Sequence, residues 1–307
     1  MVVWPPTSRI EESCQRAIQC ALDIQGKLNN QEISPNKRLS VKIGIGVGEC
    51  TILVVGGQFG RCEYLSVGDA LAQACESETK AVAGGETICS EDVYRYVRDK
   101  FEFQEAVGGD DHGHGPSDHD MKFYKIIKIT GERVQIKADA FLMRTKFSLD
   151  KLREKLSILK AFVPAAIVKY LDIEKEVWSK EIRMISSMFL NLKVDLKQTK
   201  SDEGIQRIQK IVKTVQRCVY RTKGSLNKFL MDDKGSVMVI CWGLPPLSSP
   251  DDHIRSVLCG QTLISELKNL KCGAYMGIAT GTCFTGVCGT IGGRREYSLL
   301  GYIYIDY

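Results

Sequence analysis

Residues 44–68 read GIGVGECTILVVGGQFGRCEYLSVG, and residues 277–301 read GIATGTCFTGVCGTIGGRREYSLLG. The two stretches align without a gap at a constant offset of 233 residues, and 11 of their 25 positions are identical. Ordinary composition gives roughly one or two such matches by chance. Five of the identical pairs are glycines, which predicts close backbone approach or positive φ at the same places in both copies. Two copies favour two similar modules that face each other, not a solenoid.

The order of predicted elements around each copy defines three domains. A strand (188–194), an amphipathic helix (204–220) and a hairpin (225–241) precede the second copy, whose helix spans 252–267. Two further strands are predicted at 272–280 and 283–289, joined by a turn at glycine, so the second module reads βαββαββ. The first copy follows a helix at 10–28 only, so we expect a first module at 1–130 without its front part. A helical linker at 131–180 and a second module at 181–307, truncated at its end, complete the chain.

The composition is that of a soluble globular protein, with 44% hydrophobic and 26% charged residues. The apolar runs are too short to span a bilayer, and the N-terminus does not read as a signal peptide. The 12 cysteines lie within apolar patterns, which indicates buried thiols in a reducing compartment and a cytoplasmic location. The net charge of +5 is mild, and without a basic stripe it argues against nucleic-acid binding.

Two segments of the first half have alternative interpretations. Residues 110–120 (DDHGHGPSDHD) hold three of the four histidines. They could bind zinc or nickel, but the spacing fits no closed tetrahedral site and favours a polar hairpin tip. Residues 149–171 carry apolar residues at helical spacing with a break at Pro164, which predicts a pair of linker helices.

Several motifs resemble the class III nucleotidyl cyclases. These are VKIGIGVGECTILVVGG with EYLSVGDAL in the first half, and FLMDDKGSVMVICWGLP with GIATGTCFTGVCG and EYSLLG in the second. Within that family they are most similar to the soluble, bicarbonate-responsive adenylyl cyclases. The resemblance covers about residues 2–300 and identifies a partial or divergent copy. It implies an α+β sandwich of two ferredoxin-like modules, each an antiparallel sheet with helices packed on it, related by a pseudo-two-fold axis.

The resemblance also implies a reaction. In this family the ribose 3′-hydroxyl of ATP attacks the α-phosphate and pyrophosphate leaves, giving cyclic AMP at the interface of the two modules. Mg²⁺ is the expected cofactor, held by two aspartates of the first module. ATP is the expected partner, and the modules pair within one chain.

Four residues match substrate-binding positions of the family. Lys228 aligns with the lysine that donates to an adenine ring nitrogen, and Ser298 with the hydroxyl that meets the exocyclic amine. The two are expected to approach each other across neighbouring strands. Lys42 aligns with a lysine near the triphosphate. Met231 is the fourth residue expected to bind substrate.

Each of these residues also has a purely structural interpretation. Lys228 could be a solvated hairpin lysine, Ser298 a strand hydroxyl and Lys42 a lysine that protects a strand edge. Asp232 and Asp233 are read as turn residues, because the family binds no metal in this hairpin.

Departures from the family pattern make the activity of this chain doubtful. The two metal-binding aspartates are absent, so no metal ligand and no certain catalytic residue can be named. Ile305 stands where the family has a catalytic Asn, and the Arg that follows it lies beyond Tyr307. Cys75 aligns near the bicarbonate-binding arginine, so control by bicarbonate is doubtful too. We expect a weak or inactive adenylyl cyclase; the alternative is a catalytically dead regulatory or nucleotide-binding module. An RNA-binding sheet is a poor match, because paired exposed aromatics are missing from the predicted strands.

Overall fold

The computed structural model describes residues 2–4, 9–106, 121–134, 149–164, 167, 181–194, 201–232, 235–289 and 295–301. It divides the chain into two compact units. Unit 1 comprises Met1–Thr51 and Val67–Thr145, and unit 2 comprises Ile52–Ser66 and Lys146–Tyr307. The predicted segments 110–120 and most of 131–180 lie outside the described residues, as do Asp233 and Ile305.

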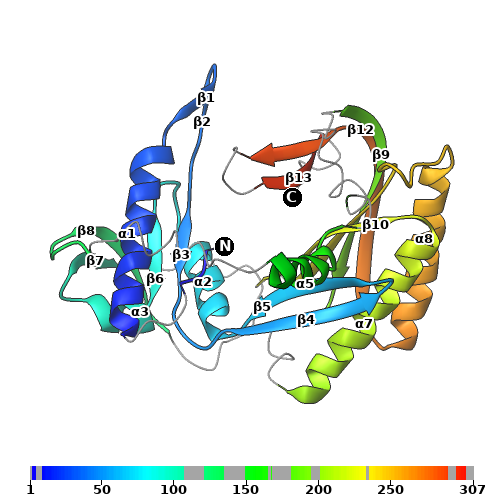
Figure 1. Ribbon diagram of the computed structural model, residues 1–307. Coiled ribbons are helices and arrows are strands. Elements are labelled where there is room, and N and C mark those ends of the chain that lie inside the picture. The colour runs from blue at the N-terminus through cyan, green and yellow to red at the C-terminus, as the bar shows by residue number, and fades with distance from the viewer. Residues whose placement is uncertain are drawn as a thin grey trace. The chain divides into compact units, whose positions relative to one another are not determined.

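Unit 2 is built on a five-stranded antiparallel sheet in the order β10-β11-β9-β12-β13 (Figure 1). Two helices, α7 and α8, connect the strands and contact each other beside the sheet. The first four strands follow the ferredoxin-like order predicted for the second module. The elements are β9 (Glu181–Leu192), α7 (Asp202–Arg221), β10 (Ser225–Asp232), β11 (Gly235–Trp242), α8 (Asp252–Asn269), β12 (Ala274–Gly289) and β13 (Arg295–Leu300).

Helix α7 illustrates why this sequence forms a helix here. Ser201 caps it, with its hydroxyl accepting a hydrogen bond from the Gly204 amide at 3.1 Å. Its buried apolar residues recur every three or four positions, so they form one stripe facing the sheet. That stripe comprises Ile208, Ile211, Val212, Val215 and Val219. It covers a core that includes the fully buried Met188, Leu190 and Ile240.

Unit 2 also contains a ribbon of two strands from the first half of the sequence, β4 (Thr51–Gln58) and β5 (Arg61–Val67). Side chains of α7 hydrogen-bond to this ribbon. Helix α5 (Leu149–Lys160) matches the first predicted linker helix. The sequence analysis assigned residues 52–66 to the first module; the structure groups them with the second, while the three-domain division itself stays a prediction.

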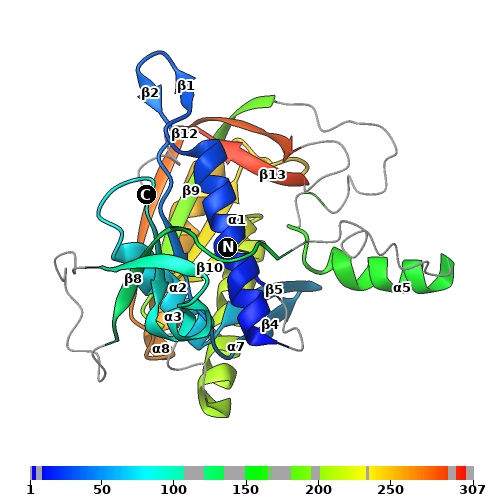
Figure 2. The ribbon, with the colours of Figure 1, turned by 90° about the vertical axis from the view of Figure 1, so that its left-hand side faces the viewer.

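Unit 1 has a four-stranded sheet in the order β3-β6-β8-β7, and a small hairpin, β1–β2, projects from it in both views (Figures 1 and 2). Its core joins α1 and α3 to the sheet through Ile18, Ile45, Val93 and Phe101. The elements are α1 (Ile10–Leu28), β1 (Glu32–Ser34), β2 (Lys37–Arg38), β3 (Ile43–Ile45), α2 (Asp69–Thr79), β6 (Thr87–Ser90), α3 (Glu91–Val97), β7 (Phe101–Glu105) and β8 (Phe123–Ile129).

One strand pair of unit 1 differs from the predicted antiparallel arrangement. Strands β3 and β6 run parallel, whereas β6–β8 and β7–β8 are antiparallel. The reason is the connection: the chain returns to the sheet through helix α2, and a crossover of this kind joins parallel strands. The α+β fold class is confirmed, and the all-antiparallel expectation is wrong for this pair.

The two copies of the repeat share a local geometry at their last glycine. A Cβ on Gly68 would lie 2.3 Å from the Glu49 carbonyl oxygen and 3.1 Å from the Cys50 Cα. A Cβ on Gly301 would lie 2.9 Å from the Thr282 oxygen and 3.1 Å from the Cys283 Cα. These neighbours occupy equivalent positions of the repeat, so the expected close approach is confirmed at this pair.

The copies differ in how their strands run. In the second copy one strand, β12, continues for 16 residues, whereas the first copy divides into β3 and β4. Gly44 and Gly277 differ as well. A Cβ on Gly44 would meet α2, but no described atom lies within 4 Å of one on Gly277. The expectation of a crowded backbone is therefore wrong at Gly277.

Candidate functional site

Lys228 lies at an irregular point of an edge strand. The register of β10 against β11 shifts between Leu226 and Lys228, which is a bulge at the buried Asn227. Lys228 itself pairs with Val239 and is half-buried. Bulges re-aim side chains and are frequent beside active sites. The residue pattern of β10 does not predict this bulge.

Ser298 lies on the other edge strand of the same sheet. It is half-buried in β13, opposite Gly286 of β12. Three strands, β11, β9 and β12, separate β10 from β13. The prediction that Lys228 and Ser298 approach each other across neighbouring strands is therefore wrong. It failed because sequence order does not reveal that β9 inserts between the two hairpins.

The register also separates the two residues along the strands. Lys228 lies in a row with Val239, Phe189 and Gly277, whereas Ser298 pairs with Gly286, nine residues further along β12. At about 3.3 Å per residue this is roughly 30 Å of strand. Figure 1 shows that β12 curves along its length, so the path along the strand is longer than the direct separation.

Lys42 and Met231 occupy different environments. Lys42 lies directly before β3 in unit 1, and its ammonium donates to the Ala81 carbonyl oxygen at 2.7 Å. Met231 lies on β10 and pairs with Ser236. Asp232 ends that strand opposite Gly235. Within the described part of the chain, no group of three or more His, Cys, Asp or Glu side chains could hold a metal ion.

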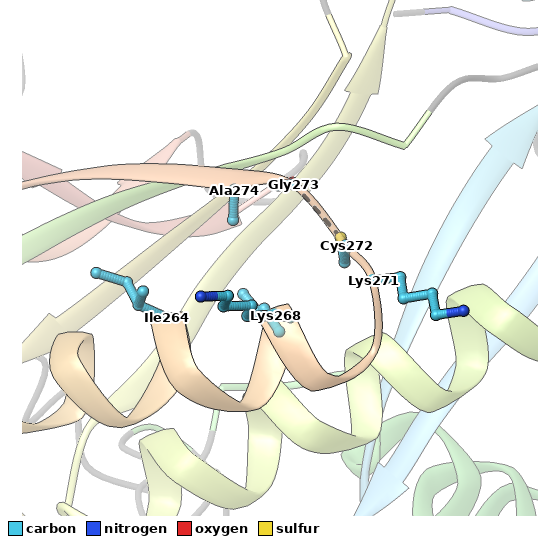
Figure 3. A pocket seen from close by; sticks show the side chains of 7 residues that line it. Ile264, Lys268, Lys271, Cys272, Gly273 and Ala274 are labelled. Carbon is cyan, nitrogen blue, oxygen red and sulfur yellow. Dashed lines mark hydrogen bonds between the residues drawn. The ribbon is translucent and has the colours of Figure 1, made fainter.

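A hollow of about 360 Å³ lies where α8 turns into β12 (Figure 3). Ile264 and Lys268 rise from α8 toward Ala274, while Lys271 points away from them. A second hollow of about 360 Å³ runs along α7, lined by Glu203, Gln206, Arg207, Lys210, Ile211 and Leu270. Neither is lined by a predicted substrate-binding residue.

A buried polar cluster that the sequence analysis missed joins the β4–β5 ribbon to α7. Arg61 donates from Nη2 to Glu63 Oε2 at 3.0 Å, and both side chains are 7% exposed. Burial raises the pKa of Glu63 to about 7, opposed by the charge of Arg61 and the amide of Gln216. Burial also raises the pKa of the nearby Tyr220. A signal was present, because Arg-x-Glu-Tyr recurs in both copies at Arg61 and Arg294.

No protein-family model matches this sequence. Adenylate cyclase type 10 of Homo sapiens is 24% identical over 295 residues, covering 92% of this chain and 18% of that protein. Its counterpart in Mus musculus is 25% identical over 303 residues, with the same two coverages. The chain is thus similar to adenylate cyclases type 10 over most of its own length. The chain spans less than a fifth of the length of these relatives.

Solved cyclase structures also align with parts of this chain. A bacterial light-regulated adenylyl cyclase aligns with a TM-score of 0.41 and 16% identity, covering 50% of this chain and 47% of that one. The adenylyl cyclase CyaB from P. aeruginosa aligns with a TM-score of 0.36 and 17% identity, covering 40% and 68%. Among the described helices none is long and apolar enough to cross a membrane.

Proposed function

We propose that this chain is part of an adenylyl cyclase that converts ATP to cyclic AMP and pyrophosphate. The observation that carries the proposal is the alignment with adenylate cyclase type 10 over 92% of the chain. The ferredoxin-like strand order of unit 2 supports it. The buried thiols of Cys89, Cys241 and Cys259 fit a reducing compartment, which supports a cytoplasmic location.

Lys228 is the residue we propose to read the base. A lysine donates and never accepts, so it suits the ring nitrogens of adenine, and a serine hydroxyl can accept from the exocyclic amine. The half-buried position of Lys228 beside a bulge supports a role for its side chain. Ser298, Met231 and Lys42 are the other proposed substrate contacts. Ser298 reaches the same base only if the curvature of β12 brings β13 back toward β10.

Mg²⁺ is the metal that this family's reaction requires. The residues that the structure describes do not fit it, because they contain no cluster of ligands. Magnesium would neutralise charge on the phosphates when bound. Among the described residues, the groups that could contact the triphosphate are cations such as Lys42.

Nucleotide binding tests the base-reading role. We expect the 307-residue chain to bind ATP more tightly than GTP in titration calorimetry. Lys228→Met should weaken ATP binding about ten-fold to a hundred-fold, the loss of one hydrogen bond to a charged group. Lys213→Met, which removes an exposed lysine of α7, is the matched control. Equal ATP affinity in the two variants would show that Lys228 does not contact the bound nucleotide.

A second candidate is a regulatory module that binds nucleotide without cyclising it. The hydrogen bond from Lys42 to the Ala81 carbonyl favours this regulatory module, because the ammonium group already has a partner within the protein. Cyclic AMP formation with Mg²⁺ and ATP separates the two. We expect little product from this chain alone, and more from a version extended upstream of Val2 by a first module that carries two metal-binding aspartates. Binding without product in both would favour the regulatory module.

A further inference from the structure

Helix α7 presents a polar surface that holds the β4–β5 hairpin by its backbone. Gln209 accepts a hydrogen bond from the Gly56 amide at 2.6 Å and donates to the Gly56 carbonyl at 3.1 Å. Gln216, seven residues or about two turns further on, lies on the same face of the helix. The two glutamines satisfy strand groups that an edge strand otherwise leaves open.

Gln216 closes the tip of the hairpin. Its Oε1 accepts from the Gln58 amide at 3.2 Å, and its Nε2 donates to the Arg61 carbonyl at 3.0 Å. The turn between them has Phe59 at φ 53° and Gly60 at φ 73°, both left-handed, as a two-residue hairpin turn requires. Phe59 meets the ring of Tyr220 edge-on at 5.7 Å. Strand, turn and helix therefore fit one another at several independent points.

One carboxyl group is buried in this docked surface. Glu63 Oε2 accepts from Arg61, while its Oε1 lies 3.0 Å from Arg61 Nε without hydrogen-bond alignment. Arg61 also donates to the Ala161 carbonyl at 3.2 Å. The groups that face Glu63 are Arg61 from β5, and Gln216 and the phenol of Tyr220 from α7. Arg61 is thus the one cation that offsets the burial of Glu63 among the described residues.

We propose that the β4–β5 hairpin is a latch on α7 whose strength is set by the protonation of Glu63. The neutral carboxyl fits the buried surface, and the carboxylate favours release of the hairpin into water. Thr51 and Val67, at the two ends of the hairpin, belong to unit 1, so the chain joins the hairpin to that unit at both ends.

The direction of the pH effect follows from the pKa of Glu63. It is about 7 in the docked hairpin, raised mainly by burial, against an ordinary value of 4.5 once the hairpin is released. A raised pKa means that the contribution of this group to docking is full below 4.5 and disappears as the pH rises through about 7. Docking should therefore be about ten-fold stronger at pH 6 than at pH 8.

Hydrogen exchange measured by mass spectrometry tests the latch. Peptides covering residues 52–66 are compared at pH 6 and pH 8, with exchange times scaled for the intrinsic chemical rate. We expect about ten-fold greater protection of the hairpin at pH 6, with no such change in peptides of β9. Glu63→Gln, a neutral isostere, should abolish the pH dependence, and the exposed Glu49→Gln should retain it.

Two results would overturn the latch. The first is equal hydrogen-exchange protection of the wild-type hairpin at pH 6 and pH 8, after correction for the intrinsic chemical rate. This test uses the wild-type protein alone and does not depend on the folding of a variant. The other is a pH dependence that survives in Glu63→Gln, or that β9 peptides share with the hairpin.

Discussion

Replacing Gly44 and Gly277 by alanine, one at a time, compares the same substitution at equivalent positions of the repeat. On Gly44 the new methyl group would lie 2.0 Å from the Ala74 carbonyl oxygen and 2.4 Å from the Glu78 amide nitrogen. Both atoms belong to the backbone of α2, so no side-chain rotation relieves the overlap. On Gly277 the methyl would have no described atom within 4 Å.

The magnitudes follow from these distances. Overpacking a close-packed site costs about 1–3 kcal/mol, and a backbone overlap of this size belongs at the upper end. A loss of about 3 kcal/mol lowers the folding equilibrium constant of unit 1 by roughly a hundred-fold. Alanine at Gly277 should change stability by less than about 0.5 kcal/mol, as for a substitution into open space.

Denaturant titration followed by hydrogen exchange is the assay. Gly44→Ala should lower the protection of α2 peptides, while Gly277→Ala should leave β12 peptides as in the wild type. Hydrogen exchange is used because it reports on α2 and β12 separately. If α2 tolerates the first substitution as well as β12 tolerates the second, the close packing of β3 against α2 is incorrect.

Two further predictions concern stability. Ser90→Ala should lower the free energy of unfolding by about 1–3 kcal/mol, because the fully buried hydroxyl both caps α3 at Val93 and donates to Gln73 at 2.7 Å. Ser201→Ala, at the exposed cap of α7, should lower it by about 1 kcal/mol. Thermal unfolding of the two variants measures both losses. Equal losses would show that burial adds nothing at Ser90. Leu190→Ala, in the middle of β9, should cost about 2–5 kcal/mol by leaving a cavity under α7 and α8, and a loss below 1 kcal/mol would contradict the described core.

The helices were the most predictable elements. The apolar spacing predicted residues 10–28 and 252–267 as helices, and α1 and α8 occupy Ile10–Leu28 and Asp252–Asn269. The order of the second module is confirmed as far as α8. The two strands predicted at 272–280 and 283–289 form the single strand β12, and the last strand of the module is β13 (Arg295–Leu300). Local periodicity suffices for such predictions, because one face of each element must be buried whatever it packs against.

The candidate site was less predictable. The sequence placed Lys228 and Ser298 in strands, but not at opposite edges of a sheet. It predicted Lys42 on a strand edge, but not the hydrogen bond to Ala81. The Arg61–Glu63 cluster was visible only as a repeated motif, since its burial depends on α7, about 150 residues away in the chain.

The sequence alone determined the internal duplication and most helices and strands of each module, because these depend on local patterns of residues. The tertiary structure decided which strands are neighbours and which unit holds the β4–β5 hairpin. It also determined which charged side chains are buried. Strand order and burial depend on pairing between residues far apart in the sequence, and local residue patterns do not reveal that pairing.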